Sequence, residues 1–141
     1  MLNHRYNKMK FLSIAIFVTL PFFLIGQLQL AQSGIYGTAC GFAGEILEER
    51  KFIEKLIKED NFELVLKRLS AVDPVDKIYA YEAYIRLQIE KERMVTEDIR
   101  VLLSNLETDD SLITTCMGCF QRQESVSSVV SKIKVEYNYK E

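Results

Sequence analysis

The segment that most constrains this chain is an apolar run of 15 residues, 11–25, which follows the basic residues Lys8 and Lys10. Small and polar residues come next and end in Ala31-Gln32-Ser33-Gly34. A basic stretch, an apolar stretch and small residues at a cleavage point are the three parts of a secretory signal peptide. The sequence therefore predicts a signal peptide over residues 1–33, cleaved before Gly34, with Met9 as an alternative start.

A membrane anchor is the alternative interpretation of the same segment. Spanning a bilayer takes about 20 apolar residues, and extending the run to Ala31 would include Pro21, Gln27 and Gln29. The pattern favours export of a bacterial protein to the periplasm or the outside, with no membrane contact once the signal is cleaved. An uncleaved N-terminal anchor stays open.

Charge and composition narrow the function classes of the remaining chain. Residues 34–141 hold 15 Lys and Arg against 20 Asp and Glu, a formal charge of −5. Such an acidic domain does not favour nucleic acid as a partner. The single histidine, His4, precedes the apolar run, so Ser–His or Cys–His catalysis has no base. No phosphate-binding loop is present. The sequence thus predicts no cofactor and no catalytic set, and favours a binding or structural role with a protein partner.

Helical periodicity dominates after a glycine-rich lead-in at 34–44, which carries Cys40. Apolar residues recur at 3.6-residue spacing over 45–141, which predicts a single α-helical domain. The expected helices cover residues 43–59, residues from 62 to just before Asp73, residues 74–92, residues from Thr96 to 108, and the C-terminal tail, where a helix is favoured over a strand. The third helix is apolar on two sides and is expected at the centre. The predicted fold class is all-α, with four or five short antiparallel helices.

A local pattern resembles HEAT-like α-hairpin repeats. It consists of Leu66-Lys-Arg-Leu69, the turn Asp73-Pro74, then Lys77, Ala80, Ala83 and Leu87. Asp76 stands where the repeat prefers valine. The resemblance covers about 45 residues and implies two stacked α-hairpins with a protein-binding surface, but no chemistry. A generic helix bundle is the alternative architecture.

Three cysteines, Cys40, Cys116 and Cys119, are the candidates for covalent chemistry. In an up-down-up-down array, the start of the first helix and the end of the fourth lie at the same end. We therefore expect a disulfide from Cys40 to Cys116 or Cys119, stabilising the domain by about 4 kcal/mol through loop entropy. A local bond between Cys116 and Cys119 is the alternative.

The three cysteines also suggest two more specific roles, in redox chemistry and in zinc binding. Cys116-Met-Gly-Cys119 has the Cys-x-x-Cys spacing of thiol–disulfide redox proteins, which is the alternative function, although no strand pattern surrounds it. A zinc site would need a fourth ligand beyond the three cysteines.

Tyr79 is expected at an exposed contact surface, because it lies on a different side of the third helix from Tyr81 and Tyr84, which we assign to the core.

Overall fold

The structure, a computed structural model, describes residues 34–91 and 93–140. The predicted signal peptide, with His4 and Met9, lies outside these residues, and the described residues form one compact unit. The elements are, in chain order, β1 (Ile35–Cys40), β2 (Glu45–Ile46), α2 (Glu48–Lys58), α3 (Phe62–Leu69), α4 (Pro74–Lys91), α5 (Glu97–Glu107), β3 (Leu112–Gly118), β4 (Phe120–Ser125) and α6 (Val126–Glu136). No helix among the described residues has the length and apolar character needed to cross a membrane.

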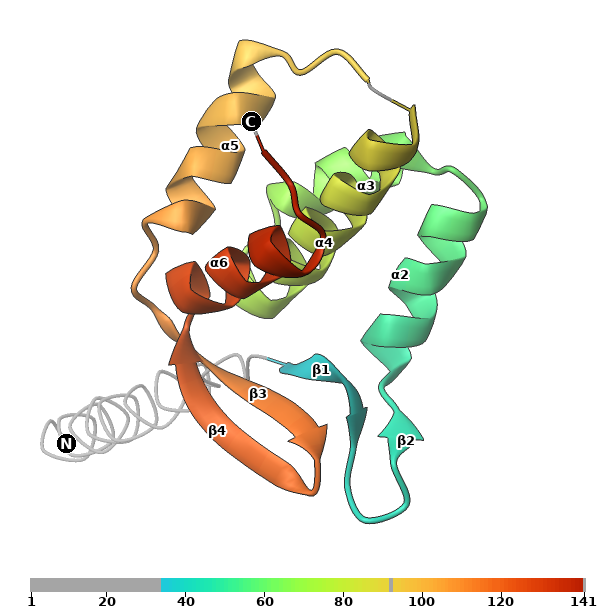
Figure 1. Cartoon of the computed structure of the whole chain (residues 1–141), viewed down its shortest axis with the longest axis vertical. Helices are drawn as coiled ribbons and strands as arrows, with labels where there is room; N and C mark the ends of the chain where they lie inside the picture. Colours follow the sequence, from blue (N-terminus) through green and yellow to red (C-terminus); the bar gives the residue numbers. More distant parts are fainter. Residues whose placement is uncertain (1–33, 92, 141) are drawn as a thin grey trace, which may run out of the picture. The chain divides into compact units, whose positions relative to one another are not determined.

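The all-α prediction is wrong, because four strands form one mixed sheet in the order β2-β1-β3-β4, with the helices gathered to one side of it (Figure 1). β1 pairs with β3 in parallel, and the two outer pairs are antiparallel. The fold is therefore α/β, and neither a stack of HEAT-like hairpins nor an all-helical bundle describes it. The expected lead-in at 34–44 is β1 and the connection to β2.

Glycine at position 37 allows β1 and β3 to lie close together. A Cβ atom at Gly37 would stand 2.2 Å from the backbone oxygen of Cys116, the residue opposite it in the parallel pair. Contacts under 3.0 Å are not tolerated between a Cβ and a backbone atom. The glycines of the lead-in thus permit strand pairing, whereas in the sequence they suggested an irregular segment.

A two-residue turn joins β3 to β4. Met117 pairs with Phe120, and Gly118 between them has a φ of +60°. Glycine with a positive φ at the first central position is the signature of a type II′ hairpin turn. The strand before the turn carries the β-branched residues Ile113, Thr114 and Thr115, which favour extended structure. The Cys-Met-Gly-Cys segment is therefore a hairpin end.

The predicted helices are present, with corrections at their ends. α2 begins at Glu48 rather than at residue 43, so Ile46, expected within this helix, lies in β2 and is exposed. Asn61 caps α3, which begins at Phe62 as expected, by accepting a bond from the Leu64 N–H at 3.2 Å. Asp73 caps α4 and accepts from the Val75 N–H at 2.8 Å.

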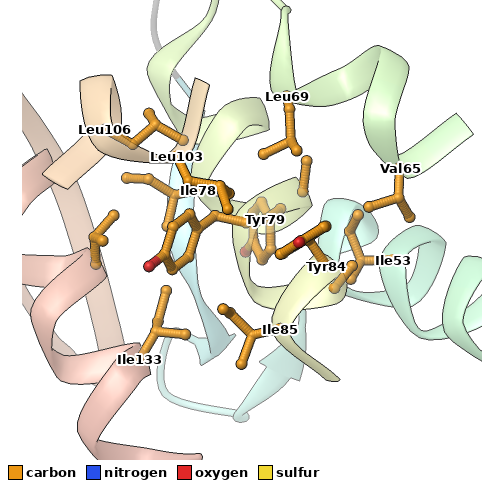
Figure 2. Packing of buried hydrophobic residues seen from close by; sticks show 14 of the residues in the cluster. Ile53, Val65, Leu69, Ile78, Tyr79, Tyr84, Ile85, Leu103, Leu106 and Ile133 are labelled. Atoms are coloured by element: carbon orange, nitrogen blue, oxygen red, sulfur yellow. The ribbon is translucent and has the colours of Figure 1, made fainter. Parts of the chain in front are cut away.

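The central position of α4 is confirmed, because it contributes more buried core residues than any other element. Its residues from Ile78 to Ile85 are all buried, and Tyr81 and Tyr84 are 0% exposed, as expected for core residues. Figure 2 shows Leu103 and Leu106 of α5 and Ile133 of α6 packed around this helix. The alanines of the HEAT-like pattern lie within this core. The pattern therefore reflects a helix that is buried on all sides.

Candidate functional site

A buried ion pair joins α2 to α4 beside the sheet. The Arg50 guanidinium donates from Nη1 to Glu82 Oε1 at 2.5 Å and from Nη2 to Glu82 Oε2 at 2.8 Å. Arg50 is 7% exposed and Glu82 is 3% exposed. Two charges taken out of water in this way need close geometry and further hydrogen bonds to offset the cost of desolvation.

Two tyrosines supply those further bonds. Tyr36 of β1 donates its hydroxyl to Glu82 Oε2 at 2.7 Å, and Tyr137, just past α6, donates to Oε1 at 3.2 Å. Burial and the Glu82 charge raise the pKa of Tyr36 well above its usual value, and the same causes raise the pKa of Tyr137 to about 12. Both hydroxyls therefore remain protonated donors at neutral pH. Each Glu82 oxygen accepts two bonds, which leaves this carboxylate poorly placed to act as a base.

Tyr79 belongs to the same buried network, so the prediction that it lies at an exposed contact surface is wrong. Its ring is 0% exposed. Its hydroxyl donates to the Gly37 carbonyl at 2.8 Å and accepts from the Gly37 N–H at 3.0 Å. The Arg50 Nε also donates to that carbonyl at 3.3 Å, and the Arg50 guanidinium lies 5.1 Å from the centre of the Tyr79 ring. The network thus fixes β1 to both α2 and α4.

Sequence reasoning missed the Arg50–Glu82 pair. Arg50 lies in a charged stretch that resembles a solvated helix face. Glu82, however, stands inside the apolar run of α4, between Tyr81 and Ala83. A carboxylate in such a run is the signal that could have been used, because a charge that cannot reach water needs a buried partner.

A cleft of about 1080 Å³ opens above this network, between the strands and helices α2, α4 and α6. Its floor is the Glu82 network, and next to it Arg86 donates to both oxygens of Glu54 at 2.6 and 2.9 Å. Apolar side chains complete the lining: Met117, Phe120, Val129 and Ile133. The cleft is therefore lined by paired charges from α2 and α4 and by apolar side chains from the β3–β4 hairpin and α6.

Another carboxylate, Glu124 of β4, also lines this cleft. It accepts bonds from Arg122, from Lys132 of α6, and from the Thr115 hydroxyl at 2.9 Å. Burial acts to raise the pKa of Glu124, but the hydrogen bonds from Lys132, Thr115 and Arg122 outweigh it and hold that pKa below its usual value. Arg122 and Lys132 have side chains 62% and 55% exposed, so this cluster, unlike the Glu82 network, faces water.

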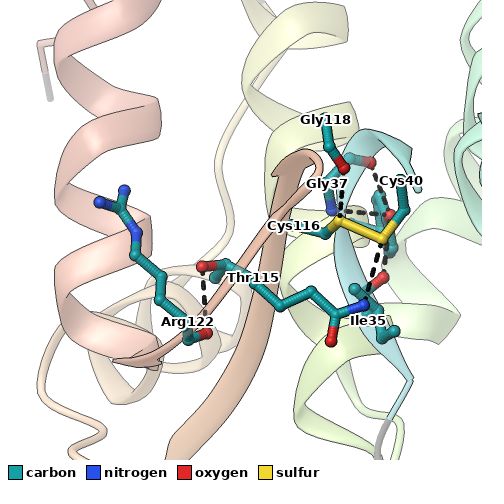
Figure 3. Close-up of a disulfide and its surroundings, with 9 residues drawn as sticks. Ile35, Gly37, Cys40, Thr115, Cys116, Gly118 and Arg122 are labelled. Atoms are coloured by element: carbon teal, nitrogen blue, oxygen red, sulfur yellow. Dashed lines mark hydrogen bonds between the residues drawn. A yellow bond between two sulfur atoms is a disulfide. The ribbon is translucent and has the colours of Figure 1, made fainter. Parts of the chain in front are cut away.

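Cys40 and Cys116 form a disulfide between β1 and β3, with their Cα atoms 5.6 Å apart (Figure 3). This confirms one of the two long-range pairings expected from the sequence. Cys119 is free and exposed, so Cys116 and Cys119 are not bonded to each other. Among the residues that the structure describes, no group of three or more His, Cys, Asp or Glu side chains is arranged to hold a metal ion.

Exposed apolar side chains gather where the two hairpins end. The Gly41 N–H donates to the Gly118 carbonyl at 2.9 Å, which holds the β1–β2 connection against the β3–β4 turn. Phe42 is 101% exposed, Met117 75% and Phe120 82%. We call Phe42, Met117 and Phe120 the hairpin-end patch. Large apolar residues grouped at one end of a molecule are characteristic of interaction sites.

Comparisons with known proteins identify no relative: no protein-family model, no curated protein and no solved structure matches this chain. The functional argument therefore rests on the residues of the site.

Proposed function

We propose that this chain is an exported, non-catalytic protein-binding module, stapled by the Cys40–Cys116 disulfide, whose binding surface is the hairpin-end patch. The exposure of Phe42, Met117 and Phe120 on the two connected hairpins carries the proposal, because three large apolar side chains in water favour a protein partner that covers them. The saturated hydrogen bonding of Glu82 supports a structural role for the buried charges.

Export is supported by the leader pattern and by the start of the domain. The Gly34 backbone nitrogen lies 3.3 Å from Asp73 Oδ2. Cleavage before Gly34 would turn that amide into an α-ammonium group facing a carboxylate, which is a favourable charge pair. A disulfide is also the usual state of paired cysteines in an oxidising compartment.

Site-specific photo-crosslinking tests the binding surface. A photoreactive aromatic amino acid replaces Phe42 in the full chain, which is produced in its native host and irradiated. Met94, 88% exposed in the α4–α5 connection, provides the matched control position. We expect a discrete protein adduct from position 42 that disappears when Met117→Ser is added, and no such adduct from position 94. Equal adducts from both positions, or none from position 42, would contradict the proposal.

Thiol–disulfide exchange is the second candidate function, favoured by the free, exposed Cys119 three residues from the bonded Cys116. Cys116 and Cys119 would act as the pair only after the bond to Cys40 is exchanged. Reduction of insulin disulfides by dithiothreitol, with this protein added as the catalyst, tests this role. Turnover that is lost in Cys119→Ser would support redox activity over a structural disulfide.

A further inference from the structure

Strand β4 lies at one edge of the described sheet, on the side away from β2 (Figure 1). Its residues from Phe120 to Gln123 are exposed. An edge strand presents a row of backbone N–H and C=O groups that another strand can pair with.

The pairing with β3 fixes which residues present those groups. In a two-residue hairpin, the flanking pair Met117–Phe120 exchanges backbone hydrogen bonds, and hydrogen-bonded pairs then alternate along the ladder. The Thr115–Arg122 and Ile113–Glu124 pairs are therefore hydrogen-bonded pairs. It follows that Gln121, Gln123 and Ser125 direct their backbone groups to the open edge.

The side chains of β4 make this edge complementary to itself. When β4 of a second copy lies antiparallel to the first, backbone hydrogen bonds form only if residues whose backbone groups face the open edge lie opposite one another. Neighbouring permitted registers therefore differ by a shift of two residues. With Gln123 opposite its own copy, Arg122 faces Glu124 of the second copy, and this contact occurs twice. The next permitted register on one side would set Arg122 against Arg122, and the next on the other side would set Glu124 against Glu124. Opposite charges directly across a ladder stabilise it and like charges destabilise it.

We propose that a second copy of this chain docks on β4, forming a two-fold symmetric, antiparallel β4–β4 pair centred on Gln123. The two sheets then become one continuous sheet of eight strands. The same self-complementary surface serves both copies, as a two-fold interface requires. Five paired residues from each copy, 121–125, are a small contact, so the dimer is weak and depends on protein concentration. This dimer does not rest on the hairpin-end patch, and either proposal stands without the other.

Disulfide trapping in the full chain tests the register. Both test variants carry Cys119→Ser, and one adds Gln123→Cys while the other adds Phe120→Cys. In the proposed dimer, the two residues at position 123 have Cα atoms about 5.5 Å apart, within disulfide range. The two residues at position 120 are about 20 Å apart, since six strand residues separate them. After mild thiol oxidation, we expect a covalent dimer from the first variant and a monomer from the second.

A charge reversal separates the specific register from chance collision. Arg122→Glu in the Gln123→Cys background would place two acidic pairs across the interface, and we expect the yield of covalent dimer to fall about tenfold or more. Arg100→Glu, at an exposed site on α5, makes the same change in net charge and should leave the yield unchanged. The proposal is overturned by no dimer from position 123, by equal trapping at positions 120 and 123, or by equal effects of the two reversals. Trapping at position 120 alone would instead reveal an end-to-end contact of the hairpins.

Discussion

The two ends of the β1–β3 pair are held in different ways. At the inner end, Tyr36 and Gly37 bond to side chains of the helices, and the network closes on the buried Arg50–Glu82 pair. At the outer end, a disulfide and the Gly41–Gly118 backbone bond hold the strands. At the inner end, the polar and aromatic side chains are buried in the hydrogen-bond network, whereas at the outer end a disulfide and a backbone hydrogen bond hold the strands. The apolar side chains of the outer end therefore remain free to contact a partner.

The largest expected effect is at the inner end. Glu82→Ala leaves the Arg50 guanidinium buried without its partner and removes the acceptor of two tyrosine hydroxyls. We expect the free energy of unfolding to fall by about 3–5 kcal/mol, measured by chemical denaturation. Glu54→Ala, which removes a partly exposed partner of Arg86, is the matched control and should cost about 1 kcal/mol or less. Equal losses in the two variants would contradict a special role for the buried pair.

The disulfide should contribute nearly as much at the outer end. Cys40→Ser opens a bond between residues 76 positions apart, and loop entropy predicts a loss of about 4 kcal/mol in the free energy of unfolding. Cys119→Ser, at the free and exposed cysteine, should change it by less than about 0.5 kcal/mol. Urea unfolding of both variants measures the difference. A large loss in Cys119→Ser would mean that Cys119 takes part in the stabilising bond.

The junction between the two ends depends on Gly37. Gly37→Ala forces a Cβ against the Cys116 backbone oxygen, and we expect the free energy of unfolding to fall by about 1–3 kcal/mol as the strands separate. At Gly34 a Cβ would lie 3.5 Å from a Val75 methyl group, which is an ordinary contact. Thermal unfolding should therefore show Gly34→Ala close to the parent protein. If Gly37→Ala unfolds at the same temperature as Gly34→Ala, the close approach of β1 and β3 does not require glycine at position 37.

The smallest effect concerns Glu124, which pairs with Ile113 at the end of β4 away from the hairpin turn. Because the pKa of Glu124 is lower in the folded protein than in the unfolded chain, Glu124 stabilises the fold above the unfolded value of about 4.3. That contribution is lost as the pH falls through the lower folded value. Glu124→Gln should therefore reduce the acid-induced loss of unfolding free energy between pH 5 and pH 3 by under about 1 kcal/mol. If the unfolding free energy of the variant falls as much between pH 5 and pH 3 as that of the parent protein, or falls more, Glu124 does not contribute in this way.

The sequence predicts the helical part of the molecule well, because its signal is local. The expected helix 74–92 corresponds to α4, and the Asp73 cap follows from neighbouring residues. The strands escape prediction because β1 and β3 are parallel partners joined by a long crossover that contains four helices. Neither strand shows a clear alternation of apolar and polar residues. The need for glycine at position 37 is evident only once the Cys116 backbone is known to lie against it.

The candidate site was predictable only in part. Cys40 and Cys116 were identified as partners because both flank the helical array, although the sequence left Cys119 as an equal choice. The strand register decides between them, since Cys119 lies in the turn beyond Gly118. The Arg50–Glu82 pair joins residues 32 positions apart and depends on how α2 packs against α4. Such a contact has no local signature beyond the unpaired acid in an apolar helix.

Peptide mapping of the natural protein under non-reducing conditions, by mass spectrometry, tests the central claim that a Cys40–Cys116 bond holds the outer end and leaves its side chains free. Trypsin leaves Cys116 and Cys119 in one peptide, and cleavage after Met117 separates them. We predict that the Cys40 peptide is linked to Cys116, that Cys119 carries a free thiol, and that the N-terminus is Gly34. A bond between Cys116 and Cys119, with Cys40 free, would contradict the account and leave redox chemistry as the better explanation.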